Sequence, residues 1–202
     1  MAPESSFYPL ITTAAQRTGL DWWLIYGVIE QESSFDPASE SGCGALGLMQ
    51  LMPSSFPAFT RTALLDPCAN VKLGAEHLRE CIGIWRLETA DEAIKFGLAS
   101  YNGGPGYALA AQRQAALAGE DQSQWAAVEP FLNLAEVNGK RPDVEQIREY
   151  VARIWRRYAA RRGTNVPECG HPASPPAPAG GGSAVAGAPS PATAPGGGEA
   201  AA

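Results

Sequence analysis

Apolar residues recur at helical spacing along much of this chain, and no run alternates for long enough to predict a confident strand. The clearest stripe consists of Val71, Gly74, Ala75, Leu78, Cys81, Ile82 and Trp85. Asp66-Pro67 precedes it, a cap residue followed by proline at the first helical position. Because Gly74 and Ala75 are small, we expect another helix to approach the stripe closely. The pattern predicts an all-α fold.

Start and stop signals divide the rest of the domain into further helices. Gly19 ends the first expected helix, and Asp21 caps the second. The residue before Pro37 disfavours the α conformation, and the Gly-rich segment 103–106 breaks the chain again. We expect helices at 6–18, 22–32, 91–100, 107–117 and 144–161. In the last of these, one face carries Ile147, Tyr150, Val151, Ile154 and Tyr158.

The composition changes near Gly163, after which large apolar residues are almost absent. Residues 172–202 contain no aromatic residue and one charge, Glu199. Such a segment cannot bury enough apolar surface to offset the entropy of ordering it. We therefore expect one domain at 1–162, an ordinary size, and a disordered tail or linker at 163–202.

The net charge of −6 disfavours nucleic-acid binding, which needs a basic patch. Five arginines gather near the end of the domain, and we interpret them as a solvated helix face. The alternative is attraction to an anionic envelope polymer. We find neither a transmembrane run nor a signal peptide. We therefore expect a mature fragment or a protein that reaches its substrate by another route, such as a phage lysis or virion protein.

The four cysteines match no zinc signature, and with two histidines in the chain we expect no metal and no cofactor. Cys43 and Cys68 fall in predicted loops, so a disulfide between them is one alternative. Cys81 lies on the apolar stripe and is expected to be a buried free thiol. Cys169 lies in the predicted tail.

Glu32 stands near the end of the second expected helix. At about 100° per residue it shares a face with the aliphatic residues Ile25, Val28 and Ile29, whereas Glu30 lies among aromatic residues. A carboxyl group on an apolar face has a raised pKa, which suits a general acid near neutral pH. The alternative is a helix-terminal glutamate that simply faces solvent.

Several motifs in order resemble the soluble lytic transglycosylase catalytic domain family, which is lysozyme-like and related to goose-type lysozyme. They span about residues 8 to 158. The matching segments are Glu-Ser-Ser-Phe-Asp-Pro at 32–37, Gly-Ala-Leu-Gly-Leu-Met-Gln-Leu-Met-Pro at 44–53, Asp66-Pro67 with Asn70 and Gly74, Ser-Tyr-Asn-Gly-Gly-Pro-Gly at 100–106, and Ile-Arg-Glu-Tyr-Val at 147–151. Gly103 departs from the family's usual alanine.

The resemblance implies an all-α lysozyme-like fold and a single catalytic residue, Glu32. Glu32 would protonate the glycosidic oxygen between MurNAc and GlcNAc, and then accept the proton of the MurNAc C6 hydroxyl. The product is 1,6-anhydroMurNAc, formed without water and without the second carboxylate of most glycosidases. The implied substrate-binding residues are Ser41, Met49, Gln50, Tyr101, Asn102 and Tyr150. Core packing is the alternative for Met49, and we expect both tyrosines to help orient Glu32.

The implied partner is the glycan strand of peptidoglycan, cut by a monomer on the periplasmic or extracellular side of the bacterial wall. Two alternatives stay open. A lysozyme-type muramidase on the same scaffold needs a second carboxylate, for which Asp36, Glu129 and Glu136 are candidates, although we expect Asp36 to be structural. The other alternative is a non-catalytic glycan-binding or assembly module. Residues 131–142 fit no known pattern and are either a loop that affects substrate choice or a connector.

Overall fold

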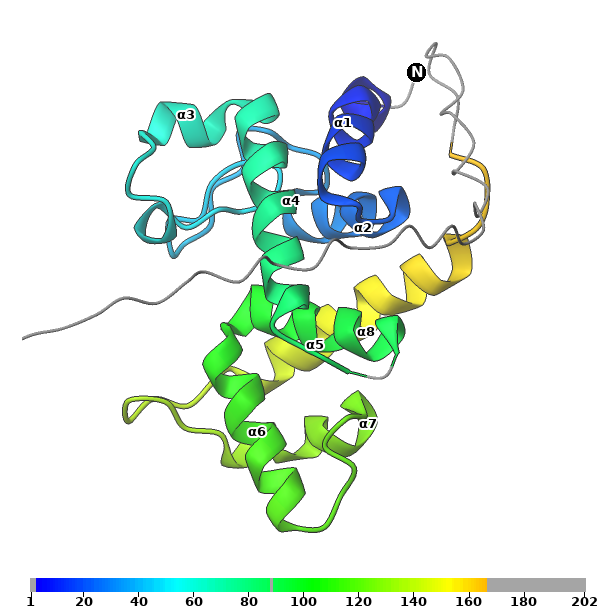
Figure 1. Ribbon diagram of the computed structural model, residues 1–202. Coiled ribbons are helices and arrows are strands. Elements are labelled where there is room, and N and C mark those ends of the chain that lie inside the picture. The colour runs from blue at the N-terminus through cyan, green and yellow to red at the C-terminus, as the bar shows by residue number, and fades with distance from the viewer. Residues whose placement is uncertain (1–2, 88, 167–202) are drawn as a thin grey trace, which may run out of the picture. The chain divides into compact units, whose positions relative to one another are not determined.

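The computed structural model describes residues 3–87 and 89–166, and the regular secondary structure of these residues is entirely helical (Figure 1). The elements are η1 Pro3–Phe7, α1 Tyr8–Thr18, α2 Trp22–Ser33, η2 Pro53–Ser55, α3 Arg61–Leu65, α4 Pro67–Gly83, α5 Ala90–Gly103, α6 Pro105–Leu117, α7 Trp125–Val128, η3 Glu129–Leu134 and α8 Val144–Arg161. The all-α prediction is confirmed. Most of the predicted tail at 163–202, from 167 onward, lies outside the described residues.

Local chemistry sets the helix ends as expected. The carboxylate of Asp21 accepts the backbone N–H of Trp23 at 2.8 Å, and that of Asp66 accepts the N–H of Ala69 at 2.8 Å. Gly19 closes α1 in the left-handed conformation at φ 72°. The break after α5 is narrower than predicted, because Gly103 is still helical and Gly104 alone separates α5 from α6.

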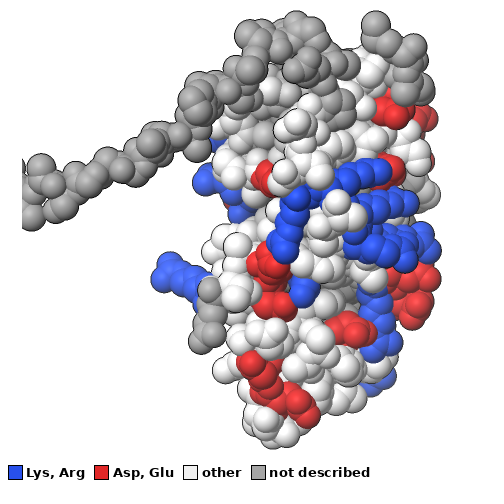
Figure 2. All heavy atoms as spheres, turned by 90° about the vertical axis from the view of Figure 1, so that its right-hand side faces the viewer, with Lys and Arg blue, Asp and Glu red and all other residues white. Residues whose placement is uncertain are grey.

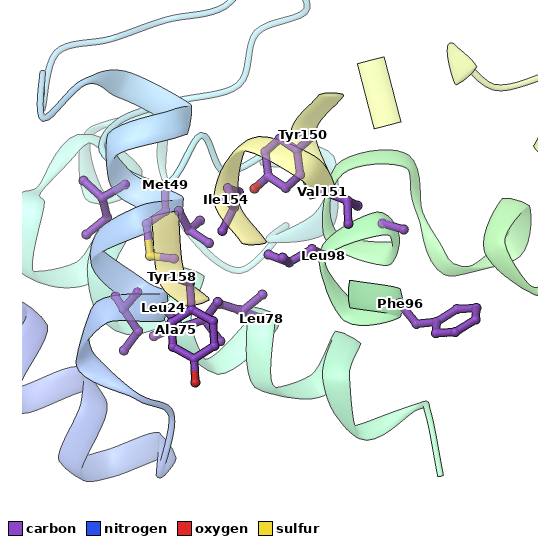
Figure 3. Packing of buried hydrophobic residues seen from close by; sticks show 14 of the residues in the cluster. Leu24, Met49, Ala75, Leu78, Phe96, Leu98, Tyr150, Val151, Ile154 and Tyr158 are labelled. Atoms are coloured by element: carbon purple, nitrogen blue, oxygen red, sulfur yellow. The ribbon is translucent and has the colours of Figure 1, made fainter. Parts of the chain in front are cut away.

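Helix α8 packs against both α2 and α5, so the last described helix joins elements from the first and middle parts of the chain. In Figure 3, Ile154 lies on the side of α8 that faces α2, and Val151 lies on the side that faces α5. The predicted apolar face of α8 is buried in full. This packing places Tyr150 in the interior, where it is 4% exposed.

Small residues permit two close contacts of α4, and one of them differs from expectation. A Cβ at Gly97 of α5 would lie 2.8 Å from the Ile82 Cα, so α4 and α5 approach each other there. A Cβ at Gly74 would instead lie 2.5 Å from the Met49 sulfur. Other helices do approach the stripe, since α4 packs against α1 and α5, but at Gly74 itself the side chain that fills the space comes from a loop.

The cysteines of the described residues are all free thiols, so the alternative of a Cys43–Cys68 disulfide is wrong. Cys43 and Cys68 are exposed, whereas Cys81 is buried as predicted, and burial raises the pKa of its thiol to about 11. Cys169 lies outside the described residues. None of the helices described is both long and apolar enough to cross a bilayer.

The arginines near the end of the domain are largely paired. Arg157 and Arg161 lie 3.2 and 3.7 Å from one carboxylate oxygen of Glu30. Arg153 pairs with Glu149, and Arg162 pairs with Asp91. Figure 2 shows a group of blue side chains across the middle of this face, bordered by red ones. The arrangement favours a solvated, ion-paired helix face over an uncompensated basic patch.

Candidate active site

Glu32 lies one residue before the end of α2, with its carboxyl group partly buried. The aliphatic residues Ile25, Val28 and Ile29 on its face are all 0% exposed. Burial raises the pKa of Glu32 to about 7, although a hydrogen bond from Tyr150 lowers it in part. The face inferred from helix geometry therefore has the environment that a general acid requires.

Tyr150 of α8 is the hydrogen-bond donor to Glu32. Its hydroxyl donates to Glu32 Oε1 at 2.7 Å, across 118 residues of sequence. Burial, followed by the negative charge of Glu32, raises the pKa of Tyr150 well above its ordinary value. The phenol thus stays protonated and available as a donor whether Glu32 is neutral or charged.

Tyr101 of α5 lies near Glu32 but donates elsewhere. Its hydroxyl donates to the Met49 backbone carbonyl at 2.8 Å. Burial raises the pKa of Tyr101 well above its ordinary value, and the charge of Glu32 is the second cause. Both predicted tyrosines therefore border the carboxyl group, but only Tyr150 forms a hydrogen bond with it.

Several of the predicted binding residues hold the loop after α2. The Ser41 hydroxyl accepts the N–H of Ala45 at 2.9 Å. Gln50, in the left-handed conformation at φ 48°, donates its side-chain amide to the carbonyls of Gly47 at 2.9 Å and Ser39 at 3.2 Å. These bonds fix the loop conformation and use the amide nitrogen of Gln50 as the donor.

The remaining predicted residues differ in exposure. The Met49 side chain is 0% exposed and packs in the core, the alternative kept open for it (Figure 3). Asn102, near the end of α5, is partly exposed, and its amide has no hydrogen-bond partner among the described residues. Of the two, only Asn102 is accessible to solvent.

Two residues of the matching segments, Ser33 and Asn70, have positioning roles that sequence reasoning did not assign. The Ser33 hydroxyl donates to the Leu48 carbonyl at 2.9 Å and ties the end of α2 to the following loop. Asn70, which is 0% exposed, accepts the Met49 N–H at 2.8 Å. The position of Asn70, a polar residue directly before the apolar stripe of α4, could have indicated that its side chain is buried and hydrogen-bonded. Nothing in the sequence pattern indicates the hydrogen bond from Ser33 to Leu48.

The candidates for a second carboxylate have other partners. Asp36 is exposed and accepts the Ala38 N–H at 2.9 Å, a turn-stabilising bond that agrees with a structural role. Glu129 pairs with Arg148, and Glu136 lies 3.8 Å from Arg141. None of the three contributes to the pKa shift of Glu32. Within the described residues, no group of three or more His, Cys, Asp or Glu side chains is placed to hold a metal ion.

The segment 131–142 begins in η3, and its residues 137–140 form a tight turn beside the α5–α6 junction. Val137 and Lys140 exchange backbone hydrogen bonds of 2.9 and 3.0 Å, with Asn138 and Gly139 at positive φ between them. A Cβ at Gly106 would lie 3.2 Å from the Val137 side chain. The turn therefore packs close to the junction that follows Asn102.

Comparison with known proteins places this geometry in context. A family model described as the transglycosylase SLT domain matches residues 9–123. The chain is 37% identical over 129 residues to a membrane-bound lytic murein transglycosylase F of Desulfosudis oleivorans, covering 63% of this chain and 28% of the relative. It is 40% identical over 80 residues to a transglycosylase of Enterobacteria phage PRD1, covering 40% and 30%. The chain thus spans less than a third of these curated relatives.

Solved structures show the same fold. The 70 kDa soluble lytic transglycosylase of Escherichia coli superposes with a TM-score of 0.56 at 22% identity, over 77% of this chain and 24% of that one. An inactive mutant of the lytic transglycosylase Slt of Pseudomonas aeruginosa gives a TM-score of 0.54 at 22% identity, over 78% and 24%. The expected lysozyme-like fold is therefore confirmed.

Proposed function

The chain belongs to the transglycosylase SLT domain family, and on this premise we propose that it is a peptidoglycan lytic transglycosylase. It cleaves the β-1,4 bond between MurNAc and GlcNAc and leaves a 1,6-anhydroMurNAc end. One observation carries the proposal. Glu32 is a carboxyl group with a pKa of about 7 and a single protein hydrogen bond, so it exists in both protonation states near neutral pH.

The reaction uses both of these states. Protonated Glu32 donates its proton to the glycosidic oxygen, the bond from that oxygen to C1 of MurNAc breaks, and GlcNAc leaves as an alcohol. The N-acetyl group of MurNAc assists at C1. The carboxylate then accepts the proton of the C6 hydroxyl as O6 bonds to C1, which restores the acid. No water is consumed, and the Tyr150 hydrogen bond stabilises the carboxylate between the two steps.

The absence of a nearby second carboxylate among the described residues supports this route over hydrolysis. A hydrolase needs a base to activate water, and the candidates are paired or exposed. For binding, we propose that Asn102 and the Gln50 amide oxygen contact sugar hydroxyl or acetamido groups. Ser41 and Met49 shape the loop, and the two tyrosines border the acid.

The proposed substrate places the activity at the bacterial cell wall, with peptidoglycan strands as the partner and a monomer as the working unit. One relative is named a membrane-bound lytic murein transglycosylase, and another, from a phage, is named a transglycosylase. An endolysin role is compatible with that phage relative. The division into a catalytic domain at 1–162 and a tail remains part of the proposal.

Mass spectrometry of soluble products from purified peptidoglycan tests the proposal. We expect muropeptides that end in 1,6-anhydroMurNAc. Reducing-end MurNAc, one water heavier, would contradict the transglycosylase route and indicate a muramidase. No release by folded protein would favour a binding module.

The variant Glu32→Gln tests the site. We expect it to lose nearly all turnover, a fall of at least about a thousandfold, because the amide cannot deliver a proton. Glu30→Gln is the matched control on the same helix, since Glu30 pairs with Arg157 and Arg161 instead. Circular dichroism verifies that both variants are folded. Full activity in Glu32→Gln would refute the assignment.

A further inference from the structure

The Met49 peptide is held from two helices. Its N–H donates to Asn70 Oδ1 at 2.8 Å, and its carbonyl accepts the Tyr101 hydroxyl at 2.8 Å. Asn70 belongs to the first turn of α4, and Tyr101 belongs to α5. One residue of the loop therefore connects a buried amide to a phenol that borders Glu32.

Asn70 is built rigidly into this position. Its amide nitrogen donates to the carbonyls of Leu46 at 2.9 Å and Leu64 at 2.6 Å, so the side chain forms three hydrogen bonds at 0% exposure. A Cβ at Gly47 would lie 2.5 Å from the Asn70 amide nitrogen, which shows how closely the loop fits around it. Without Asn70, the Met49 N–H and the Leu64 carbonyl would lose this partner and the Leu46 carbonyl would keep only the Leu51 N–H, at a cost that favours rearrangement of the loop.

The titratable groups around Glu32 come from α8 and α5, and α4 adds two that lie on the Tyr101 side. Tyr150 of α8 donates to it, and Tyr101 of α5 lies near enough for the two groups to interact electrostatically. On α4, the ring of His77 lies 5.3 Å from that of Tyr101, with Cys81 beside it. Among these groups, Tyr101 is the donor whose hydrogen bond depends on the loop.

We propose that Asn70 is a positioning residue that fixes the Met49 peptide and thereby keeps the Tyr101 hydroxyl on the Met49 carbonyl and away from Glu32. The inference rests on the proposed function and identifies a residue that helps to keep Glu32 protonated at neutral pH. If the Met49 carbonyl turned away, the Tyr101 hydroxyl would be released to the Glu32 carboxylate. A second phenol donor would stabilise the charged form and lower the pKa of Glu32, so less of the acid would be protonated at neutral pH.

The pH dependence of kcat/KM in Asn70→Ala tests this role. In the wild type, we expect activity to fall on the alkaline side as Glu32 loses its proton. We expect the alkaline limb in Asn70→Ala to move to lower pH by about one unit, so that the loss of activity is roughly tenfold greater at pH 8.5 than at pH 5.5. If Asn70→Ala does not fold, Asn70→Ser takes its place with the same expectation, because its shorter side chain removes the amide oxygen that accepts the Met49 N–H.

Tyr101→Phe shows whether the shift depends on the Tyr101 hydroxyl. We expect the alkaline limb of the double variant Asn70→Ala/Tyr101→Phe to coincide with that of Tyr101→Phe alone, since no hydroxyl is left to redirect. A limb that still moves in the double variant would overturn the proposal, as would an unshifted limb in folded Asn70→Ala.

Glu92→Ala separates this role from general destabilisation. Glu92 is also buried, at 7% exposure, and its carboxylate accepts from Lys95 and from the Trp125 N–H, near the other end of α5. We expect a lowered Tm and an unmoved alkaline limb. If Glu92→Ala shifts the limb as Asn70→Ala does, the effect is not specific to Asn70 and the proposal fails. A wild type that releases no 1,6-anhydro product would instead refute the proposed function.

Discussion

At the scale of single residues, two glutamates on one helix have opposite environments. Glu30 lies beside Arg157 and Arg161, which compensate its charge. Glu32, two residues further along, faces aliphatic side chains and receives one neutral donor, Tyr150. A rotation of about 200° around the helix thus separates an ion-paired carboxylate from a carboxyl group with a pKa of about 7.

Removing the Tyr150 hydroxyl should raise the pKa of Glu32 further. The hydrogen bond favours the carboxylate, so Tyr150→Phe leaves desolvation unopposed. We expect the alkaline limb of kcat/KM to move to higher pH by about half to one unit, while kcat below pH 6 falls because the carboxylate intermediate loses its donor. The measurement is a pH profile from 5 to 9.

Tyr158→Phe is the control for this experiment. Tyr158 lies on the same buried face of α8, and its environment involves Arg162 and Asp91 but not Glu32. Its alkaline limb should match that of the wild type. A limb that moves to lower pH in Tyr150→Phe would show that the phenol does not stabilise the carboxylate.

At the scale of helices, the contact between α4 and α5 depends on one glycine. A Cβ at Gly97 would lie 2.4 Å from the Ile82 Cγ1 and 2.8 Å from its Cα, and a backbone atom cannot move aside as a side chain can. This contact supports α5, which ends with the residues that border Glu32. The packing of α5 on α4 is therefore coupled to the position of Tyr101.

Gly97→Ala should destabilise the fold. We expect the free energy of unfolding to fall by about 1–3 kcal/mol, because overpacking forces the helices apart. The free-energy cost of this strain exceeds the gain in helix propensity from replacing glycine by alanine. Gly83→Ala, at the end of α4, is the matched control, since its Cβ would meet nothing within 4 Å. That variant should be neutral or slightly more stable. Urea unfolding measures both, and equal effects would contradict the packing argument.

Elements with strong local signals could be predicted, and short ones could not. The bounds of α8 agree with its apolar period, and the caps at Asp21 and Asp66 agree with their residue types. Helices α3 and α7, of five and four residues, are too short to show a period. Their positions depend on tertiary contacts, such as the bond from the Trp125 N–H to Glu92.

Only part of the candidate site could be predicted from the sequence, for the same reason. Helix geometry identified the face of Glu32, because its neighbours are three to seven residues away. The contact with Tyr150 spans 118 residues, and only the family resemblance indicated it. The Tyr101 hydroxyl donates to the Met49 carbonyl, and the Met49 side chain packs against Gly74. Both contacts depend on the conformation of the loop, which the periodicity of the sequence does not predict.

At the scale of the whole molecule, the cost of holding Glu32 in an apolar site must appear in the global stability. Its pKa is raised from 4.5 to about 7, so between these values the folded state binds more protons than the unfolded state. The stabilising contribution of the protonated acid is fully present below pH 4.5 and is lost as pH rises through 7. The difference corresponds to about 3 kcal/mol at alkaline pH, a large part of the stability of an ordinary domain.

Glu32→Gln removes this term while keeping the shape of the side chain. We expect the free energy of unfolding of the variant, relative to that of the wild type, to rise by about 3 kcal/mol between pH 4 and pH 8.5. The other titrating groups are common to both proteins and cancel in the comparison. Urea unfolding of the two proteins at each pH gives the four values needed. A relative stability that does not change with pH would mean that Glu32 titrates as an ordinary exposed carboxylate, and the acid–base role inferred from its burial would lose its physical basis.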